Sequence, residues 1–241
     1  MKILMLNQKT GINYDDVNKY ISETKIYQKN FVIFPTSIFL PIFVESGYNV
    51  GIQNIAESSK KNQTGEVTAK QASDSGARYV IIGHSERRTN QKETDEVLVN
   101  KFNEAIDNKL NIVFCIGESL VDYKLKNTIN KISEQLYNVL SKIKKMDKRI
   151  ELYVAYEPLW AIGTGMTPTN IEIEKVAKTI KDFLNETGFD SAKVLYGGSV
   201  SDDNIKELST IDIVDGFLVG GASNVPTKVI QMCEYLNNST N

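Results

Sequence analysis

The 241-residue sequence contains a single histidine, His84, and only two cysteines, Cys115 and Cys233. The cysteines lie far apart and show no metal-ligand spacing, so we expect two buried, reduced thiols rather than a disulfide or a zinc site. A lone histidine cannot build a multi-histidine metal centre. The scarcity of both residue types therefore gives metal chemistry no support.

Neither sign of charge is in excess, because 28 basic residues face 30 acidic ones and the formal net charge is −2. No basic surplus is available to neutralise a nucleic-acid backbone. Long apolar runs are also lacking. Eighteen apolar residues never follow one another, and only four lie between Lys2 and Asn7, too few for a secretory signal. We therefore expect a cytoplasmic protein with neither nucleic acid nor a membrane as partner.

A repeating unit dominates the chain: a short apolar run, a loop, and a segment with apolar residues three and four apart. The runs are apolar on both faces, as buried parallel strands are. The eight runs span residues 2–6, 31–34, 49–53, 79–82, 111–115, 152–156, 193–196 and 215–220. Strict alternation of strands and helices requires a parallel sheet, either an open doubly wound layer or a closed eightfold barrel.

Length and repeat number favour the barrel, since eight units in about 250 residues is the usual size of that fold. Signatures of nucleotide-binding open sheets are missing. "GTGMTP" at 163–168 has proline in place of a third glycine, and no GxxxxGK[ST] motif occurs. No low-complexity linker divides the chain. We predict one (β/α)8 barrel domain over residues 1–241.

Two helix starts can be read from capping residues. Thr169 followed by Glu172 makes a capping box, and Ser201 with Asp202 and Asp203 indicates the start of the next helix. Apolar stripes mark the buried faces of three helices: Leu98, Phe102, Ala105 and Ile106; Ile129, Ile132, Leu136 and Val139; and Ile173, Val176, Ile180 and Phe183.

Chemistry in such a barrel gathers where the carboxyl ends of the strands meet. Asn7 and Lys9 follow the first run and, two apart, point to the same side of an extended chain. His84 and Glu86 follow the fourth run, and Glu157 follows the sixth. Alone, each has a plain structural alternative: a surface lysine, a structural histidine, a glutamate that closes a turn. Together at one mouth they indicate acid–base catalysis.

Glycine turns follow the last three strands, in "GTG" (163–165), "YGGSV" (196–200) and "VGGAS" (219–223). Bare backbone N–H groups of such turns approach anions closely, although glycine pairs more often mark turns alone. With an imidazole, a carboxylate and an ammonium at the same mouth, the glycine turns predict a phosphosugar site.

Four motifs in this order resemble the triosephosphate isomerase family: "GHSERR" (83–88), "YEPLWAIGTG" (156–165), "YGGSV" and "VDGFLVGGAS" (214–223). "QTGEV" (63–67) and "CIGE" (115–118) extend the resemblance over the chain. It implies a single TIM barrel that interconverts dihydroxyacetone phosphate and glyceraldehyde 3-phosphate through an enediolate, in glycolysis and gluconeogenesis, without metal or organic cofactor.

The resemblance also implies roles. Glu157 is the base that moves a proton between two carbons, and His84 is the electrophile, whose neutral imidazole can both donate and accept a proton. Lys9 faces the developing oxyanion with Asn7 beside it, and Glu86 supports the site. Backbone N–H groups at Gly163, Ser199, Gly220 and Gly221 are expected to hold the phosphate.

Two larger features follow from the same resemblance. The loop bearing Thr64 is expected to reach the site of a second copy near Asn7 and Lys9, which makes the protein a homodimer. Residues 158–168, with Trp160 and Ile162 beside glycines, are expected to form a lid that excludes water.

The sequence departs from the family at three positions. Gln8 replaces a usual tryptophan and is expected to point away from the site. Met166 and Pro168 change the distal end of the lid. Since Pro168 has no N–H, Tyr196 is expected to lose its lid bond, whereas Ser199 can still bond the Gly165 N–H.

Three other functions are weaker. A ribulose-phosphate epimerase would need acidic proton carriers and metal-binding histidines. A non-catalytic phosphosugar-binding barrel would be expected to lack Lys9, His84 or Glu157, and all three are present. A surface adhesin has no signal peptide in its favour.

Overall fold

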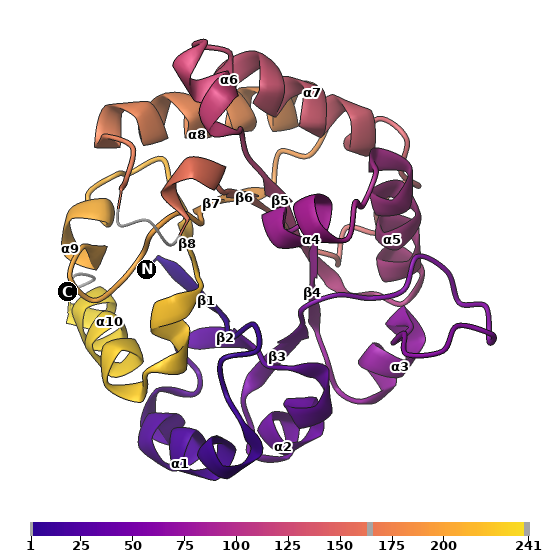
Figure 1. Ribbon diagram of the computed structural model, residues 1–241, viewed down its shortest axis with the longest axis vertical. Coiled ribbons are helices and arrows are strands. Elements are labelled where there is room, and N and C mark those ends of the chain that lie inside the picture. Colours follow the sequence, from indigo (N-terminus) through magenta and orange to yellow (C-terminus); the bar gives the residue numbers. More distant parts are fainter. Residues whose placement is uncertain (1, 163–165, 239–241) are drawn as a thin grey trace.

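Eight parallel strands form one closed barrel in chain order, and the last strand pairs with the first (Figure 1). The computed structural model describes residues 2–162 and 166–238. The strands are β1 (Ile3–Asn7), β2 (Phe31–Phe34), β3 (Asn49–Ile52), β4 (Tyr79–Ile82), β5 (Asn111–Ile116), β6 (Leu152–Tyr156), β7 (Lys193–Tyr196) and β8 (Gly216–Val219). The (β/α)8 barrel prediction is therefore confirmed, and all eight predicted runs contain strands.

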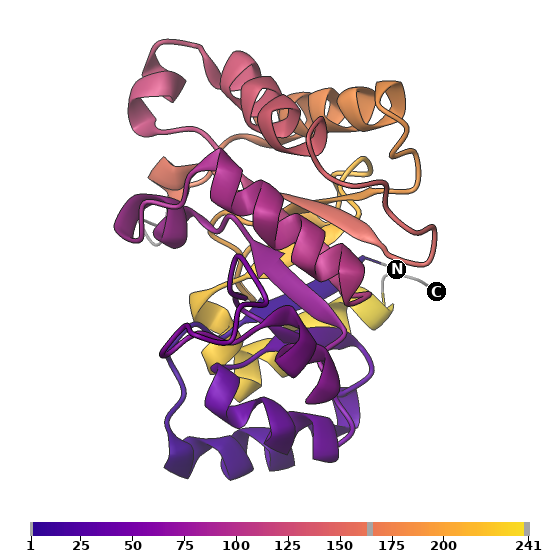
Figure 2. The same cartoon turned by 90° about the vertical axis from the view of Figure 1, so that its right-hand side faces the viewer.

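Helices surround the barrel, except that α4 lies inside their ring, over the barrel mouth (Figure 1). The α-helices are α1 (Tyr14–Thr24), α2 (Leu40–Glu45), α3 (Ala69–Asp74), α4 (Ser85–Asn90), α5 (Asp95–Asp107), α6 (Leu120–Lys124), α7 (Thr128–Leu140), α8 (Asn170–Glu186), α9 (Ile205–Leu208) and α10 (Pro226–Asn238). Short 3₁₀ helices are η1 (Lys25–Tyr27), η2 (Ser37–Phe39), η3 (Leu159–Ala161) and η4 (Gly221–Asn224). In side view, α7 and α8 lie side by side, opposite α1 and α2 (Figure 2).

The apolar core has two layers, which explains why the strands are apolar on both faces. Along β1, Leu4 and Leu6 pack outward against the helices, whereas Met5 belongs to the barrel interior. The interior cluster consists of Met5, Val32, Phe34, Ile81, Val113, Cys115, Tyr153, Ala155, Leu195 and Leu218. Cys115 and Cys233 are both buried and free, as expected.

The two predicted helix starts have different outcomes. Thr169 caps α8 and exchanges hydrogen bonds with Glu172, so that capping box is confirmed. The start predicted at Ser201 is wrong, because α9 begins at Ile205 with Asn204 as its N-cap. The Ser201 hydroxyl instead accepts the N–H of Asp203, which stabilises a turn ahead of the helix.

No helix in the described part of the chain is long and apolar enough to cross a membrane.

Candidate active site

A cavity of about 710 Å³ opens at the carboxyl ends of the strands. The residues that line it include Asn7, Lys9, His84, Glu157, Ile162, Ser199, Gly220, Gly221 and Lys228. The mouth therefore brings together seven of the predicted site residues, which come from the ends of five strands. Glu86 lies beside it as the ion-pair partner of Lys9. Gly163, the remaining predicted phosphate ligand, lies outside the described residues.

Glu157 is a buried carboxylate, with 3% of its side chain exposed. Its backbone continues β6, because its N–H donates to the Ile116 carbonyl at 2.7 Å. Its Oε2 accepts the N–H of Ser85 at 3.3 Å, while its Oε1 lies 3.3 Å from Nε2 of His84. The carboxylate is thus held on two sides, and one of these contacts is with His84, its predicted partner in the reaction.

His84 owes its orientation to the start of α4. It is the N-cap residue of that helix, and its Nδ1 accepts the Glu86 N–H at 3.3 Å. An acceptor nitrogen carries no proton, so in this arrangement Nε2 is the protonated nitrogen and faces Glu157. The Glu86 carboxylate is 3.9 Å from Nδ1, too far for a hydrogen bond. The geometry therefore favours a neutral ring that donates from Nε2.

Lys9 reaches the mouth for a different reason from the one that its spacing suggests. Its φ of 52° is left-handed, so the chain is not extended there, and the alternation argument from Asn7 is wrong. Its N–H donates to Asn7 Oδ1 at 3.2 Å. Its carbonyl accepts from Thr36 at 3.0 Å and from Gln53 at 2.8 Å. These three hydrogen bonds fix the backbone turn at Lys9, and the side chains of both Asn7 and Lys9 line the cavity.

Glu86 forms an ion pair with the ammonium of Lys9. Partial burial raises the pKa of Glu86, but the hydrogen bond and charge of Lys9 outweigh that effect and hold its pKa below the ordinary value. A glutamate that stays ionised can orient Lys9 within the mouth. This ion pair is the contact through which Glu86 would support the site.

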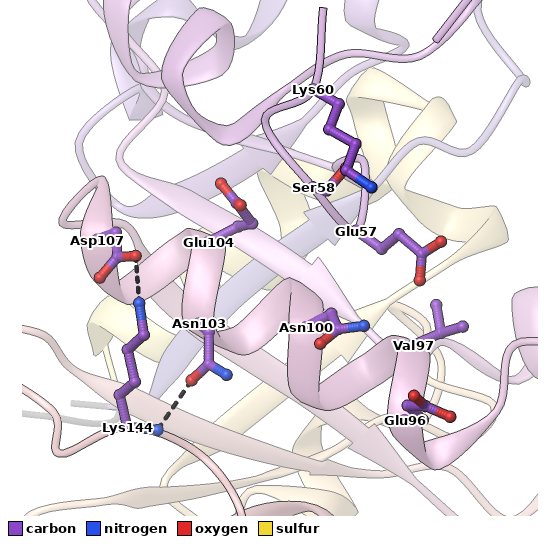
Figure 3. Close-up of a pocket in the computed structure, with 10 residues that line it drawn as sticks. All are labelled: Glu57, Ser58, Lys60, Glu96, Val97, Asn100, Asn103, Glu104, Asp107 and Lys144. Carbon is purple, nitrogen blue, oxygen red and sulfur yellow. Dashed lines mark hydrogen bonds and ion pairs between the residues drawn. The ribbon is translucent and has the colours of Figure 1, made fainter. Parts of the chain in front are cut away.

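A second cavity, of about 660 Å³, lies between α5 and the connection that follows β3 (Figure 3). Four carboxylates line it, from Glu57, Glu96, Glu104 and Asp107, with only two lysines. One of these lysines, Lys144, is already paired with Asp107. Excess negative charge disfavours a phosphate here, so this cavity does not compete with the barrel mouth as the predicted phosphosugar site. In the described part of the chain, no three His, Cys, Asp or Glu side chains group as metal ligands do.

A known protein family matches the sequence of this chain. Its description is triosephosphate isomerase, and the match covers residues 2–236. The chain belongs to the triosephosphate isomerase family. Among curated relatives of that name, the protein of Aspergillus oryzae is 35% identical over 221 residues, which is 88% of each chain. The protein of Mesomycoplasma hyopneumoniae (strain 232) is 38% identical over 240 residues, or 94% of this chain and 96% of the relative. That of Ruthia magnifica is 39% identical over 196 residues, or 80% and 79%.

In this member of the triosephosphate isomerase family, Arg88 supports the turn before His84, a role that the sequence did not predict. Its guanidinium donates to the carbonyls of Gly83 and Cys115 and pairs with Asp95. Gly83, with a φ of +75°, forms the turn that places His84 at the mouth. The second arginine of "GHSERR" therefore fixes that turn, a role that spacing along the chain does not reveal.

Two glycines make room for Glu157. A Cβ on Gly117 would lie 1.8 Å from the Glu157 carbonyl oxygen, and one on Gly197 would lie 3.0 Å from its Cγ. The Gln135 amide forms hydrogen bonds with both backbone groups of Gly117, at 2.9 and 2.8 Å.

Burial raises the pKa of the Cys115 thiol well above its ordinary value, and the charge of Glu157 adds to the shift, so a protonated thiol faces the carboxylate.

The departures from the family pattern have distinct surroundings. Gln8 is 1% exposed and does not line the cavity, as expected; both polar atoms of its amide are buried and make no hydrogen bond within the described residues. Met166 is half exposed, whereas Pro168 is buried. The Tyr196 hydroxyl is buried and makes no hydrogen bond within the described residues.

Ser199 contacts the segment after β6, since its hydroxyl donates to the Ala161 carbonyl at 2.6 Å. Its expected partner Gly165 lies outside the described residues. Ser199 thus joins the turn after β7 to the 3₁₀ helix η3.

Proposed function

We propose that this mouth catalyses the isomerisation after which the family is named. As an aldose–ketose isomerase, the chain would interconvert dihydroxyacetone phosphate and glyceraldehyde 3-phosphate through an enediolate, within glycolysis and gluconeogenesis. The observation that supports the assignment most is the contact between Glu157 and His84, 3.3 Å apart beside Lys9 in one cavity. A base, a neutral donor and a cation are the three groups that this proton transfer needs.

Glu157 is the proposed base. It takes the proton from the carbon next to the substrate carbonyl and returns it to the neighbouring carbon. A carboxylate in water is too weak for this step, so the carbonyl oxygen must be stabilised as it gains charge. Burial of Glu157 to 3% exposure removes competing water from the carboxylate.

His84 and Lys9 are the proposed partners of the oxygens. The Nε2 proton of His84 goes to the oxyanion that forms, and the ring then accepts the proton of the other hydroxyl, so protons balance over the cycle. The Lys9 ammonium stabilises the enediolate charge. Preorganised groups of this kind are commonly worth about 10²- to 10³-fold in rate each. Asn7 holds the Lys9 turn and Glu86 orients its ammonium.

The phosphate is proposed to lie on backbone N–H groups of Ser199, Gly220 and Gly221, with Gly163 as a further donor. A Cβ on Gly220 would approach the Lys9 Cε to 3.4 Å, which puts this glycine next to a cation, and one on Gly221 would meet nothing within 4 Å. Open backbone beside an ammonium suits an anion. Acid–base steps alone complete the reaction, so no cofactor is proposed.

We further infer a homodimer, in the cytoplasm. Tyr14 and Ile38 follow β1 and β2 on the side of the mouth and are 71% and 72% exposed. Thr64 is also exposed, in the connection whose first residue, Gln53, bonds the Lys9 carbonyl. Exposed apolar residues beside a protruding loop favour burial against a second copy.

A coupled assay tests the function directly. Purified protein is given glyceraldehyde 3-phosphate, and the dihydroxyacetone phosphate that forms is reduced with NADH, with and without EDTA. We expect turnover that the chelator leaves unchanged. No turnover would favour the non-catalytic phosphosugar-binding barrel or an epimerase, and turnover abolished by EDTA would mean an isomerase that depends on a metal, against the proposed mechanism.

A further inference from the structure

Residues that follow β5 contact both the segment after β6 and the first turn of α8. The Glu118 Oε1 accepts the indole N–H of Trp160 at 2.9 Å. The ring of Tyr123 stacks on the same indole, with centroids 4.2 Å apart and planes 29° apart. The Tyr123 hydroxyl donates to Glu172 Oε1 at 2.9 Å. One phenol side chain therefore touches residues that are twelve positions apart in the chain.

Tyr123 is held on a short, well-capped helix. Ser119 is the N-cap of α6, and its hydroxyl and N–H both donate to the Asp122 carboxylate, at 2.6 and 3.2 Å. Asp122 returns its N–H to the Ser119 hydroxyl at 3.1 Å. Reciprocal bonds of this kind fix the first turn of a helix. The Tyr123 backbone is consequently anchored independently of the residues that its side chain contacts.

Glu172 divides its two oxygens between two tasks. Oε2 accepts the N–H and hydroxyl of Thr169, both at 2.8 Å, and so fixes the start of α8. Oε1 is left for Tyr123. Burial raises the pKa of Glu172, but these bonds outweigh it and hold its pKa below the ordinary value. An ionised carboxylate accepts a stronger hydrogen bond than a neutral one.

We propose that Tyr123 is a positioning residue of the isomerase site, which sets the place of Trp160 relative to the start of α8. Trp160 precedes Ala161, whose carbonyl accepts the Ser199 hydroxyl, and Ile162, which lines the cavity. Because η3 links these residues, a shift of the indole moves one wall of the mouth. The inference rests on the proposed function, since it assigns a role in that same site.

Trp160 is the only tryptophan of the chain and reports on this contact directly. We would compare wild type with Tyr123→Leu, which removes stack and hydroxyl, and Tyr123→Phe, which removes the hydroxyl alone. Tyr137→Leu is the matched control, because Tyr137 is 62% exposed on α7 and the ring that stacks on Trp160 is that of Tyr123. Emission and acrylamide quenching are measured without ligand, and then kcat and KM for glyceraldehyde 3-phosphate.

We expect Tyr123→Leu to make Trp160 more accessible to acrylamide and to lower kcat/KM about three- to tenfold, chiefly through KM, because the lost stack and hydrogen bond act on the site only through the position of Trp160. Tyr123→Phe keeps the ring stack, so it should show wild-type quenching and lower kcat/KM about two- to threefold. Tyr137→Leu should match wild type. A structural role alone would change the melting temperature while quenching and KM stayed constant, and that result would overturn the proposal.

If Tyr123→Leu does not fold, Tyr123→Phe decides the matter. A wild-type KM in that variant would show that the hydrogen bond to Glu172 has no effect on the site, and would overturn the proposal. The proposed function fails separately, if wild type shows no isomerase activity. In that case the quenching comparison, made without substrate, still tests the stack, and the affinity for glycerol 3-phosphate replaces KM.

Discussion

Nε2 of His84 lies 3.3 Å from Oε1 of Glu157, and each side chain is more than nine-tenths buried. Because Nδ1 of the same ring accepts the Glu86 N–H, Nε2 is the nitrogen left to donate. The proposed base therefore contacts the nitrogen from which the proposed electrophile would donate. A substrate carbonyl that enters must take the place of the carboxylate at Nε2, which couples substrate binding to release of the base.

The protonation of His84 can be read without ambiguity, since the chain has no other histidine. We expect nitrogen-resolved NMR at pH 7 to show a neutral ring with the proton on Nε2 and an unprotonated Nδ1. A Glu86→Gln variant is a useful control, because it keeps the backbone N–H that bonds Nδ1 and should give the same pattern. A doubly protonated ring, or a proton on Nδ1, would contradict the proposed donor.

The contributions of the Tyr196 and Ser199 hydroxyls to catalysis can be measured separately. The Tyr196 hydroxyl makes no hydrogen bond within the described residues, whereas Ser199 bonds the Ala161 carbonyl. We expect Tyr196→Phe to change kcat/KM less than about twofold and Ser199→Ala to lower it about three- to tenfold, the kinetic equivalent of one neutral hydrogen bond. Steady-state kinetics of both variants provide the test. Equal damage would mean that Tyr196 bonds a group of the lid after all.

The fold was more predictable than the site because the two depend on different information. Strands such as β1 and β6 follow from local apolar runs, since a barrel buries both faces of each strand. The start of α9 was missed because Ser201 and Asp203 cap a turn as readily as a helix.

The site residues themselves follow from strand ends, but their partners do not. Glu86 pairs with Lys9, 77 positions away, and no periodicity relates those two positions. The inward turn of Lys9 depends on a positive φ that lysine seldom adopts. Contacts between loops of different strands need the folded chain, which is why Arg88 and Gln135 were also missed.

Thr64 tests the proposed dimer. Thr64→Arg places a charge where a second copy is expected to bury the loop, so we expect weaker association and lower activity together. Asn130→Arg adds the same charge at an exposed position of α7 and should change neither. Light scattering gives the mass, and the coupled assay gives the activity at matched concentration. A clean monomer with full activity would refute the coupling.

Glu93 forms the most deeply buried ion pair outside the mouth among the described residues. Its side chain is 5% exposed and that of its partner Lys101 is 4% exposed. Burial raises the pKa of Glu93, but the bonds from Lys101 and Arg87 outweigh it and hold its pKa below the ordinary value. A depressed pKa stabilises the fold fully above the unfolded pKa near 4.3, and the contribution is lost as pH falls further.

We expect Glu93→Gln to lower the free energy of unfolding by about 3–5 kcal/mol at pH 7, because Lys101 stays buried without its partner. Urea unfolding at pH 7 and pH 4, at one protein concentration, should show this difference shrinking at the lower pH. Glu134→Gln breaks an exposed pair with Lys131 and should change little. A difference that grew as pH fell would reverse the sign and contradict the assignment.

The most direct test of the account is the turnover of Glu157→Gln in the coupled assay. The amide keeps the size of the carboxylate but cannot take a proton, so we expect kcat to fall at least about a thousandfold. Melting temperature and affinity for inorganic phosphate should match wild type, and Glu186→Gln, at an exposed position, should keep full activity. If kcat of Glu157→Gln stays within about tenfold of wild type while both controls hold, the base is another group and the mechanism proposed for this mouth is wrong.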